Sequence, residues 1–157
     1  MQKITPFLWF DDNAEEAVNL YISLFEDSKI ESVARYGDAG PGPKGSVMTI
    51  SFRLAGQEFM ALNGGPVFTF SPATSFFVDC ETQAEVDFLW EKLSEGGQVQ
   101  QCGWLTDRFG VTWQIVPSLL GKLTGDPDPV KSQRVVQAML RMVKLDSAEL
   151  QRAYDGK

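Results

Sequence analysis

The chain has 157 residues, two cysteines, no histidine and a formal net charge of −7. This length suits one domain, and the 43% hydrophobic and 22% charged content is ordinary for a globular protein. The lack of histidine excludes a Ser-His-Asp triad, an HExxH zinc site and a two-His-one-carboxylate iron site. No apolar run approaches the ~18 residues of a membrane span, and the first residues lack a signal-peptide core. We therefore expect a cytoplasmic protein with no membrane partner.

The negative charge is concentrated before residue 118. Residues 1–117 hold seven Lys/Arg and sixteen Asp/Glu, a net charge of −9, whereas residues 118–157 hold seven and five, a net charge of +2. An acidic body argues against a nucleic-acid partner, because phosphate backbones are bound by clusters of lysine and arginine. We interpret the small positive excess of the last segment as a solvated helix face.

The first part of the chain predicts a strand, a helix and three further strands. The expected ranges are a strand over 5–10, a helix over 14–25 and strands over 30–36, 47–54 and 58–62. Asn13 and Glu16 have the spacing of a capping box at the start of the helix. Turn residues over 37–45 and at 55–57 separate the last three strands.

The same order then begins again. The expected ranges are a strand over 74–79, a helix after a second capping box at Thr82 and Glu85, and strands over 98–105 and 111–116. The two parts align at an offset of 69 residues up to the first strand after the helix. The offset is 54 at the final hairpin, where Gly56 and Phe59 fall on Gly110 and Trp113. We therefore expect a βαβββ unit used twice.

The last segment has a different pattern. A turn over 125–129 precedes apolar residues at helical spacing, and Asp146 with Glu149 caps a last short helix. We interpret the methionines of this stripe as core or interface packing. The expected organisation is one domain over 1–157, with repeat one at 1–70, repeat two at 71–117 and a helical tail at 118–157.

A tandem βαβββ repeat of this length resembles the vicinal oxygen chelate superfamily, which includes glyoxalase I, bleomycin-resistance proteins and extradiol dioxygenases. Four segments are similar to its PhnB-like branch, which is often filed under the name 3-demethylubiquinone-9 3-methyltransferase. They are FDDNAEEA at 10–17, ALNGGP at 61–66, CGWLTDRFG at 102–110 and VTWQIVP at 111–117. The resemblance covers essentially the whole chain, tail included. It implies an α+β fold in which each repeat curls its mixed sheet into a cup.

The resemblance also implies where a metal would bind. Metal-dependent members place four ligands, usually His or Glu, on the first and last strand of each repeat. These positions fall on Thr5 and Thr74, each fixed to within one residue, and on Met60 and Gln114. Two hydroxyls, a thioether and an amide do not supply the charge of a divalent zinc, iron or nickel site. We therefore expect no metal and no cofactor, and we do not carry over glyoxalase or dioxygenase activity.

Strand alternation predicts the lining of the cups, because successive side chains point to opposite faces. The predicted ligand pocket contains Thr5, Phe7, Trp9, Met60, Leu62, Asn63, Thr74, Phe76, Thr112 and Gln114. An apolar and aromatic lining with a few polar groups is typical of small-molecule sites. The alternatives are that these side chains fill the core, and that Asn63 and the glycines after it form an ordinary turn.

Three functional hypotheses follow. The first is a small-molecule-binding protein that has lost its metal positions. The second is a metal-independent enzyme of unknown reaction, with Glu58 as the candidate acid-base group and Cys80 or Cys102 as candidate thiols. The third is a structural or regulatory protein whose tail, through Met139 and Met142, extends an interface.

The resemblance implies a homodimer, because superfamily members commonly form one. The methyltransferase name gains no support from the residues. A nucleotide-fold methyltransferase needs alternating strands and helices with a glycine-rich turn that opens a helix, and this order is absent from the sequence.

Overall fold

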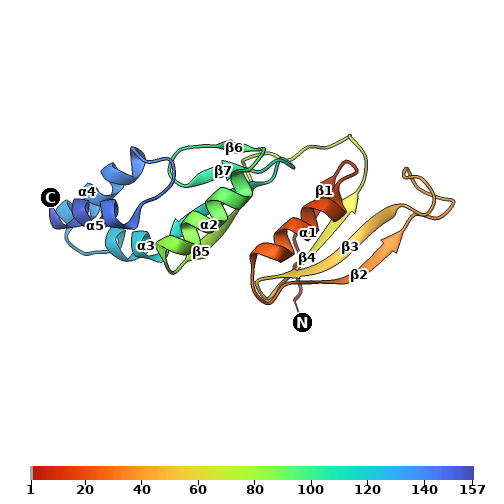
Figure 1. Cartoon of the computed structure of the whole chain (residues 1–157), viewed down its shortest axis with the longest axis horizontal. Coiled ribbons are helices and arrows are strands. Elements are labelled where there is room, and N and C mark those ends of the chain that lie inside the picture. Colours follow the sequence, from red (N-terminus) through yellow and green to blue (C-terminus); the bar gives the residue numbers. More distant parts are fainter. Residues whose placement is uncertain (1) are drawn as a thin grey trace. The chain divides into compact units, whose positions relative to one another are not determined.

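The computed structural model describes residues 2–157, which form two compact units that meet in sequence between Phe70 and Ser71. Each unit contains a four-stranded mixed sheet with a helix against one of its faces (Figure 1). We call the other face of each sheet its open face. The fold is α+β with a repeated βαβββ unit, as the sequence predicts.

The first unit contains β1 (Phe7–Phe10), α1 (Ala14–Leu24), β2 (Lys29–Arg35), β3 (Val47–Leu54) and β4 (Gln57–Asn63). The strand order is β1-β4-β3-β2, with β1 parallel to β4 and the other pairs antiparallel. Alternate residues of β3 and β4, such as Phe52 and Ala61, are buried together with Val18 and Tyr21 of α1. The residues between them in the strands are half-buried, and they form the open face.

The second unit contains β5 (Ser75–Cys80), α2 (Gln83–Ser94), β6 (Gln98–Val99), β7 (Trp104–Thr106) and β8 (Thr112–Pro117) in the order β5-β8-β7-β6. The strand predicted over 98–105 is thus wrong, because the chain turns and β6 pairs antiparallel with β7. Cys102 and Gly103 have φ angles of 62° and 82°, which no continuous strand accommodates. This turn gives the second repeat its full set of four strands.

The offset of 69 is also wrong for the first strand of each repeat. Phe7 pairs with Met60, and Phe77 pairs with Gln114, so β1 and β5 align at an offset of 70. Three residues connect β1 to α1, whereas two residues connect β5 to α2, and this difference restores the offset of 69 in the helices. A shift of one residue moves every side chain of a strand to the other face.

The two helices are capped in different ways. Thr82 Oγ1 accepts a hydrogen bond from the Glu85 N–H, which confirms the predicted cap. The Glu85 carboxylate accepts in return from the Glu81 N–H, one residue before the position that a capping box uses. Asn13 forms no side-chain cap, so the first capping box is wrong. Instead, Asn63 at the end of β4 accepts a hydrogen bond from the Ala14 N–H at 2.8 Å.

The tail forms α3 (Ser118–Thr124), α4 (Pro129–Leu140) and α5 (Ser147–Asp155) around Leu123, Val135 and Leu150. Asp146 caps α5 through the Glu149 N–H, as predicted. Residues 142–147 attach the tail to the second sheet. The Cys102 and Gly103 N–H groups donate to carbonyls of this segment, and its Leu145 is fully buried. Among residues 2–157, no helix combines the length and apolar character needed to cross a membrane.

Candidate functional site

A hollow of about 170 Å³ lies on the open face of the first sheet. Its lining comes from the segment before β1, from β2, and from β3 and β4, and consists of Thr5, Glu31, Ser51, Phe52, Glu58, Phe59 and Met60. The β3–β4 register places Ser51 opposite Met60 and Arg53 opposite Glu58. Sequence reasoning named Thr5, Met60 and Glu58 but missed Ser51 and Glu31. Alternation along 47–54, combined with the hairpin register, would have placed Ser51 beside Met60.

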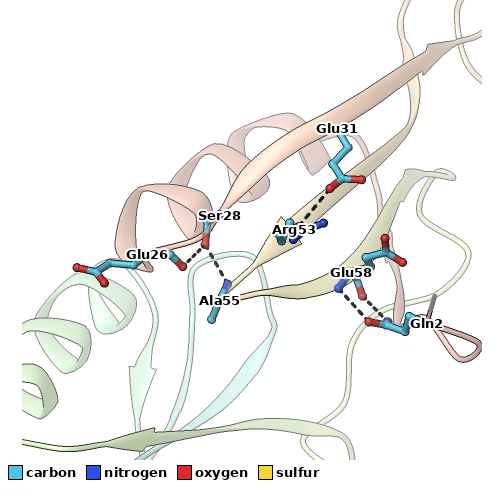
Figure 2. A network of polar contacts seen from close by, with 7 residues as sticks. All are labelled: Gln2, Glu26, Ser28, Glu31, Arg53, Ala55 and Glu58. Atoms are coloured by element: carbon cyan, nitrogen blue, oxygen red, sulfur yellow. Dashed lines mark hydrogen bonds and ion pairs between the residues drawn. The ribbon is translucent and has the colours of Figure 1, made fainter.

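The polar groups of the hollow differ in whether they have partners (Figure 2). An Arg53 guanidinium nitrogen lies 3.3 Å from a Glu31 carboxylate oxygen. The Gln2 side-chain amide donates to the Glu58 carbonyl and accepts from the Glu58 N–H, at 2.8 and 3.1 Å. These bonds occupy the backbone of Glu58 only. The Glu58 carboxylate and the hydroxyls of Thr5 and Ser51 form no hydrogen bond or ion pair with any described residue.

The other end of the same open face is closed by its own chain. The Trp9 indole N–H donates to the Gly65 carbonyl at 2.9 Å, and the ring lies edge-on to Phe68. A Cβ atom at Gly64 would lie 2.5 Å from the indole, so this glycine is needed for the close approach. Trp9 and Leu62 therefore lie outside the hollow, and Phe7, between the two ends, is 52% exposed.

Asn63 was predicted to line the pocket, and this is wrong. It pairs with Phe10, a buried residue on the helix-covered face. Its side chain accepts from the Ala14 N–H and donates to the Val47 carbonyl, while its own carbonyl accepts from the Tyr36 hydroxyl. Asn63 therefore joins α1, β3 and the end of β2, and its polar groups are already occupied.

In the second sheet, the one-residue shift of β5 shows that Phe76 and Thr74 were wrongly predicted to line the pocket. Phe76 packs against Trp113 on the helix-covered face, with ring centroids 5.3 Å apart, and Thr74 lies before β5 in an exposed bend. The open face carries Ser75 and Phe77 instead. The Gln114 amide donates to the Ser75 hydroxyl at 2.9 Å, so the second repeat pairs the groups that correspond to Thr5 and Met60.

The other polar groups of the second open face are also partnered. The Gln100 amide donates to the Thr106 hydroxyl, which is 3.3 Å from the Thr112 hydroxyl. Thr112 is 1% exposed, so it contributes no accessible surface to a pocket. Trp104 pairs with Gln114 in the place where Ser51 pairs with Met60. The bulky indole thus occupies the position that a small hydroxyl occupies in the first sheet.

The two cysteines lie outside the hollow. Cys80 is fully buried, and burial together with the nearby Glu85 carboxylate raises the pKa of its thiol to about 12. A thiol with this pKa stays protonated at neutral pH and is a poor nucleophile. Cys102 is half-buried in the turn between β6 and β7, next to the tail. Neither cysteine therefore supplies a reactive thiol to the hollow.

Sequence reasoning also missed the role of Asp107, which it treated only as part of a turn. Asp107 is 3% exposed, and its carboxylate accepts from the N–H groups of Phe109 and Val111 and from the Trp113 indole N–H. The three bonds are 2.9–3.0 Å long. Asp107 therefore holds the β7–β8 turn and positions Trp113 beneath the sheet. It is a structural carboxylate.

The four positions at which the resemblance predicts metal ligands hold residues that do not fit a divalent transition metal. With the corrected register, they are Thr5, Met60, Ser75 and Gln114, and the Gln114 amide already donates to Ser75. This set contains no carboxylate, imidazole or thiolate. Across residues 2–157, no group of three or more His, Cys, Asp or Glu side chains is arranged to hold a metal ion.

Two solved structures of similar proteins share this architecture, and a third match is more distant. The PhnB protein from Bacillus cereus is 44% identical, with a TM-score of 0.69, and the match covers 74% of this chain and 99% of that one. Protein PA1353 from Pseudomonas aeruginosa is 27% identical, with a TM-score of 0.62, over 74% of this chain and 98% of that one. A glyoxylase/bleomycin resistance protein/dioxygenase domain from Frankia sp. EAN1pec is 16% identical, with a TM-score of 0.38, over 72% and 89% of the two chains.

The matched part of the chain ends before the tail. The model of the family described as 3-demethylubiquinone-9 3-methyltransferase matches residues 2–116, so the expectation that the resemblance includes the tail is wrong. No curated protein matches the sequence. The family match spans both repeats and agrees with the identity to the Bacillus cereus structure. The chain therefore belongs to the 3-demethylubiquinone-9 3-methyltransferase family of PhnB-like proteins.

Proposed function

We propose that this chain is a metal-independent small-molecule-binding protein whose ligand occupies the hollow of the first repeat. The observation that carries the proposal is that three residues of the hollow have polar side-chain groups with no hydrogen-bond or ion-pair partner among residues 2–157. Thr5, Ser51 and Glu58 line the hollow, and Met60 adds an apolar contact. A few polar groups on an apolar wall are what a small-molecule site needs in order to orient its ligand.

The proposal leaves out the two activities that names of similar proteins suggest. Chemistry of the glyoxalase type needs a metal, and the donors at the corresponding positions do not fit one. Methyl transfer on a nucleotide fold needs a doubly wound parallel sheet, whereas this chain has two four-stranded mixed sheets. If a reaction is found in the hollow, Glu58 is the candidate acid-base group, because it is the lining carboxylate without an ion pair to any described residue.

Methionine methyl groups offer a direct test. In protein labelled with ¹³C at its methionine methyls, Met60 reports on the hollow, and Met139 and Met142 in the tail serve as internal references. We expect members of a chemically diverse fragment library to shift the Met60 signal saturably, with little change at the tail methionines. A library that leaves Met60 unmoved would overturn the proposal.

Two variants of β3 locate the binding. Ser51→Trp places an indole in the hollow, as Trp104 does in the second sheet, and should abolish the fragment-induced shift of Met60. Thr49→Trp is the matched control, because Thr49 is also half-buried on the open face but does not line the hollow. It should bind fragments as the wild type does. Equal binding by both variants would show that the fragments bind elsewhere.

We also infer a homodimer, in which the tail extends the interface. Met139 and Met142, the predicted interface residues, pack against the tail's own core. Leu140 and Val143 support the proposal instead, because they are 56% and 43% exposed at the end of α4 and just beyond it. The double variant Leu140→Lys and Val143→Lys should give a monomer by light scattering. An unchanged mass, whether monomer or dimer, would remove the tail from the interface.

A further inference from the structure

We propose that the hollow of the first repeat is specific for a ligand that carries a primary ammonium group, with Glu58 as its counter-ion. This inference rests on the proposed function and adds the chemical class of the ligand to it. It depends on three observations: the charge balance of the hollow, the difference between the two repeats, and the number and kind of the acceptor groups on the lining residues.

The charges of the hollow do not cancel. Glu31 and Glu58 both line it, and Arg53 is opposed to Glu58 across the β3–β4 hairpin. The Arg53 guanidinium is nevertheless bound to Glu31, and Figure 2 shows the Glu58 carboxylate outside that pair. The pair of Arg53 and Glu31 is neutral, so one negative charge remains at the hollow. Because Glu58 is half-buried, this charge is screened less than one in bulk solvent.

The second repeat shows what a fully satisfied arrangement looks like at the same positions. By sheet register, Arg53 and Glu58 correspond to Thr106 and Thr112, which pair across the β7–β8 hairpin. There the Gln100 amide, Thr106 and Thr112 form one continuous hydrogen-bonded chain. In the first repeat the corresponding series of bonds ends at Arg53, because the Glu58 carboxylate has no partner among residues 2–157. A ligand that completes this series of bonds would therefore present to the Glu58 carboxylate a hydrogen-bond donor with a positive charge.

An ammonium group satisfies these acceptors best. It carries three N–H donors and one positive charge, and the residues of the hollow offer the Glu58 carboxylate and two hydroxyl groups besides the Glu31 carboxylate that pairs with Arg53. A neutral alcohol has a single O–H donor, and an anion would be repelled by Glu58. The volume of about 170 Å³ suits an ammonium group with a short alkyl chain, and Met60 provides an apolar surface for that chain.

The test uses three probes of similar size: n-butylammonium, n-butanol and butyrate. Each is titrated into full-length protein while the Met60 methyl signal is followed. We expect n-butylammonium to shift Met60 saturably and to bind about tenfold or more tightly than the other two, because hydrogen bonds between charged groups are about twice as strong as neutral ones. The n-butylammonium affinity should fall as salt is raised.

Three substitutions assign the selectivity. Glu58→Gln should weaken n-butylammonium binding about tenfold or more while it leaves n-butanol binding unchanged. Glu26→Gln removes the same charge from a side chain that points away from the hollow, and it should bind as the wild type does (Figure 2). Glu31→Gln should also weaken binding, because it frees Arg53 to pair with Glu58 across the hairpin.

The outcomes separate this inference from the proposed function. If n-butanol or butyrate binds as well as n-butylammonium, or if Glu58→Gln keeps full affinity for the cation, the ammonium specificity is wrong and the binding site stands. If no probe shifts Met60 but other fragments do, the specificity is again wrong. If neither the probes nor any fragment shifts Met60, both proposals fail.

Discussion

The two repeats share a backbone plan but differ in how their open faces are finished. In the first repeat, Glu31, in a charged pair with Arg53, and Glu58, whose carboxylate has no partner among the described residues, line a hollow for which the small Ser51 leaves room. In the second repeat, neutral hydroxyls and amides bond one another, and Trp104 takes the place of Ser51. The difference teaches that a duplicated fold need not duplicate its site. A few substitutions on one sheet face decide which copy stays open.

The largest expected effect on stability is that of removing the buried carboxylate in the β7–β8 turn, compared with an exposed carboxylate in the first repeat. Asp107→Ala would leave three N–H donors without their acceptor, and we expect it to lower the free energy of unfolding by about 3 kcal/mol. Asp38→Ala in the long loop of the first repeat should cost under about 0.5 kcal/mol, because that carboxylate is exposed. Urea denaturation measures both. A loss of under about 1 kcal/mol for Asp107→Ala would contradict the structural role.

The N-terminal caps of α1 and α2 should also contribute unequally to stability, with the larger contribution from the cap of α1. Asn63→Ala removes a cap and a second hydrogen bond that crosses the unit, and we expect a loss of about 2 kcal/mol. Thr82→Ala removes one local cap and should cost about 1 kcal/mol. Equal losses in urea denaturation would show that the long-range cap of α1 has no extra value.

Ser51 and Trp104 occupy corresponding positions in the two sheets, so the small residue of the first repeat can be introduced into the second. Trp104→Ser should lower the free energy of unfolding by about 1–2 kcal/mol, since the indole is half-buried. Added indole should raise the melting temperature of this variant more than that of the wild type. Trp90→Ser, a half-buried residue of α2, serves as the control. Equal responses of the two variants to indole would argue against a hollow opened at Trp104.

The thiol of Cys80 is a titratable group in the core of the second repeat, and the first repeat contains no cysteine. Cys80 occupies the register position of Phe10, and its pKa is raised by burial to about 12, above the 9.0 of an exposed thiol. Because the folded state holds the proton more tightly, this contribution to stability is present below pH 9 and is lost as the pH rises. From pH 8 to 10, the wild type should lose about 1.4 kcal/mol more than Cys80→Ala. Parallel pH profiles would refute this.

The smallest effect lies in the β3–β4 turn. Ala55 has a φ of 49°, a left-handed conformation that glycine adopts without strain. Ala55→Gly should therefore raise the free energy of unfolding by about 0.5 kcal/mol. Gly56 has a φ of 80°, and Gly56→Ala should lower it by about 1 kcal/mol. A destabilising Ala55→Gly would show that the loss of chain entropy outweighs the relief of strain.

Much of the fold was predictable because its signals are local. The caps at Thr82 and Asp146 involve residues three positions apart, and helix spacing and strand alternation are read within one element. The first helix shows the limit of such signals. Asn13 has the sequence of a cap, yet Asn63, 49 residues beyond the Ala14 that it caps, provides the bond.

The sequence by itself determined that a βαβββ unit occurs twice, though not the turn that separates β6 from β7, and it determined the separate tail and three of the residues that line the hollow. The tertiary structure alone decided which face each strand presents. Because three residues connect β1 to α1 and only two connect β5 to α2, Phe76 does not correspond to Phe7, and it lies on the helix-covered face instead. The tertiary structure also decided that Arg53 pairs with Glu31 and not with Glu58. The partner of Arg53 depends on how the sheet arranges the Glu31 and Glu58 side chains around its guanidinium, and spacing along the chain does not contain this information.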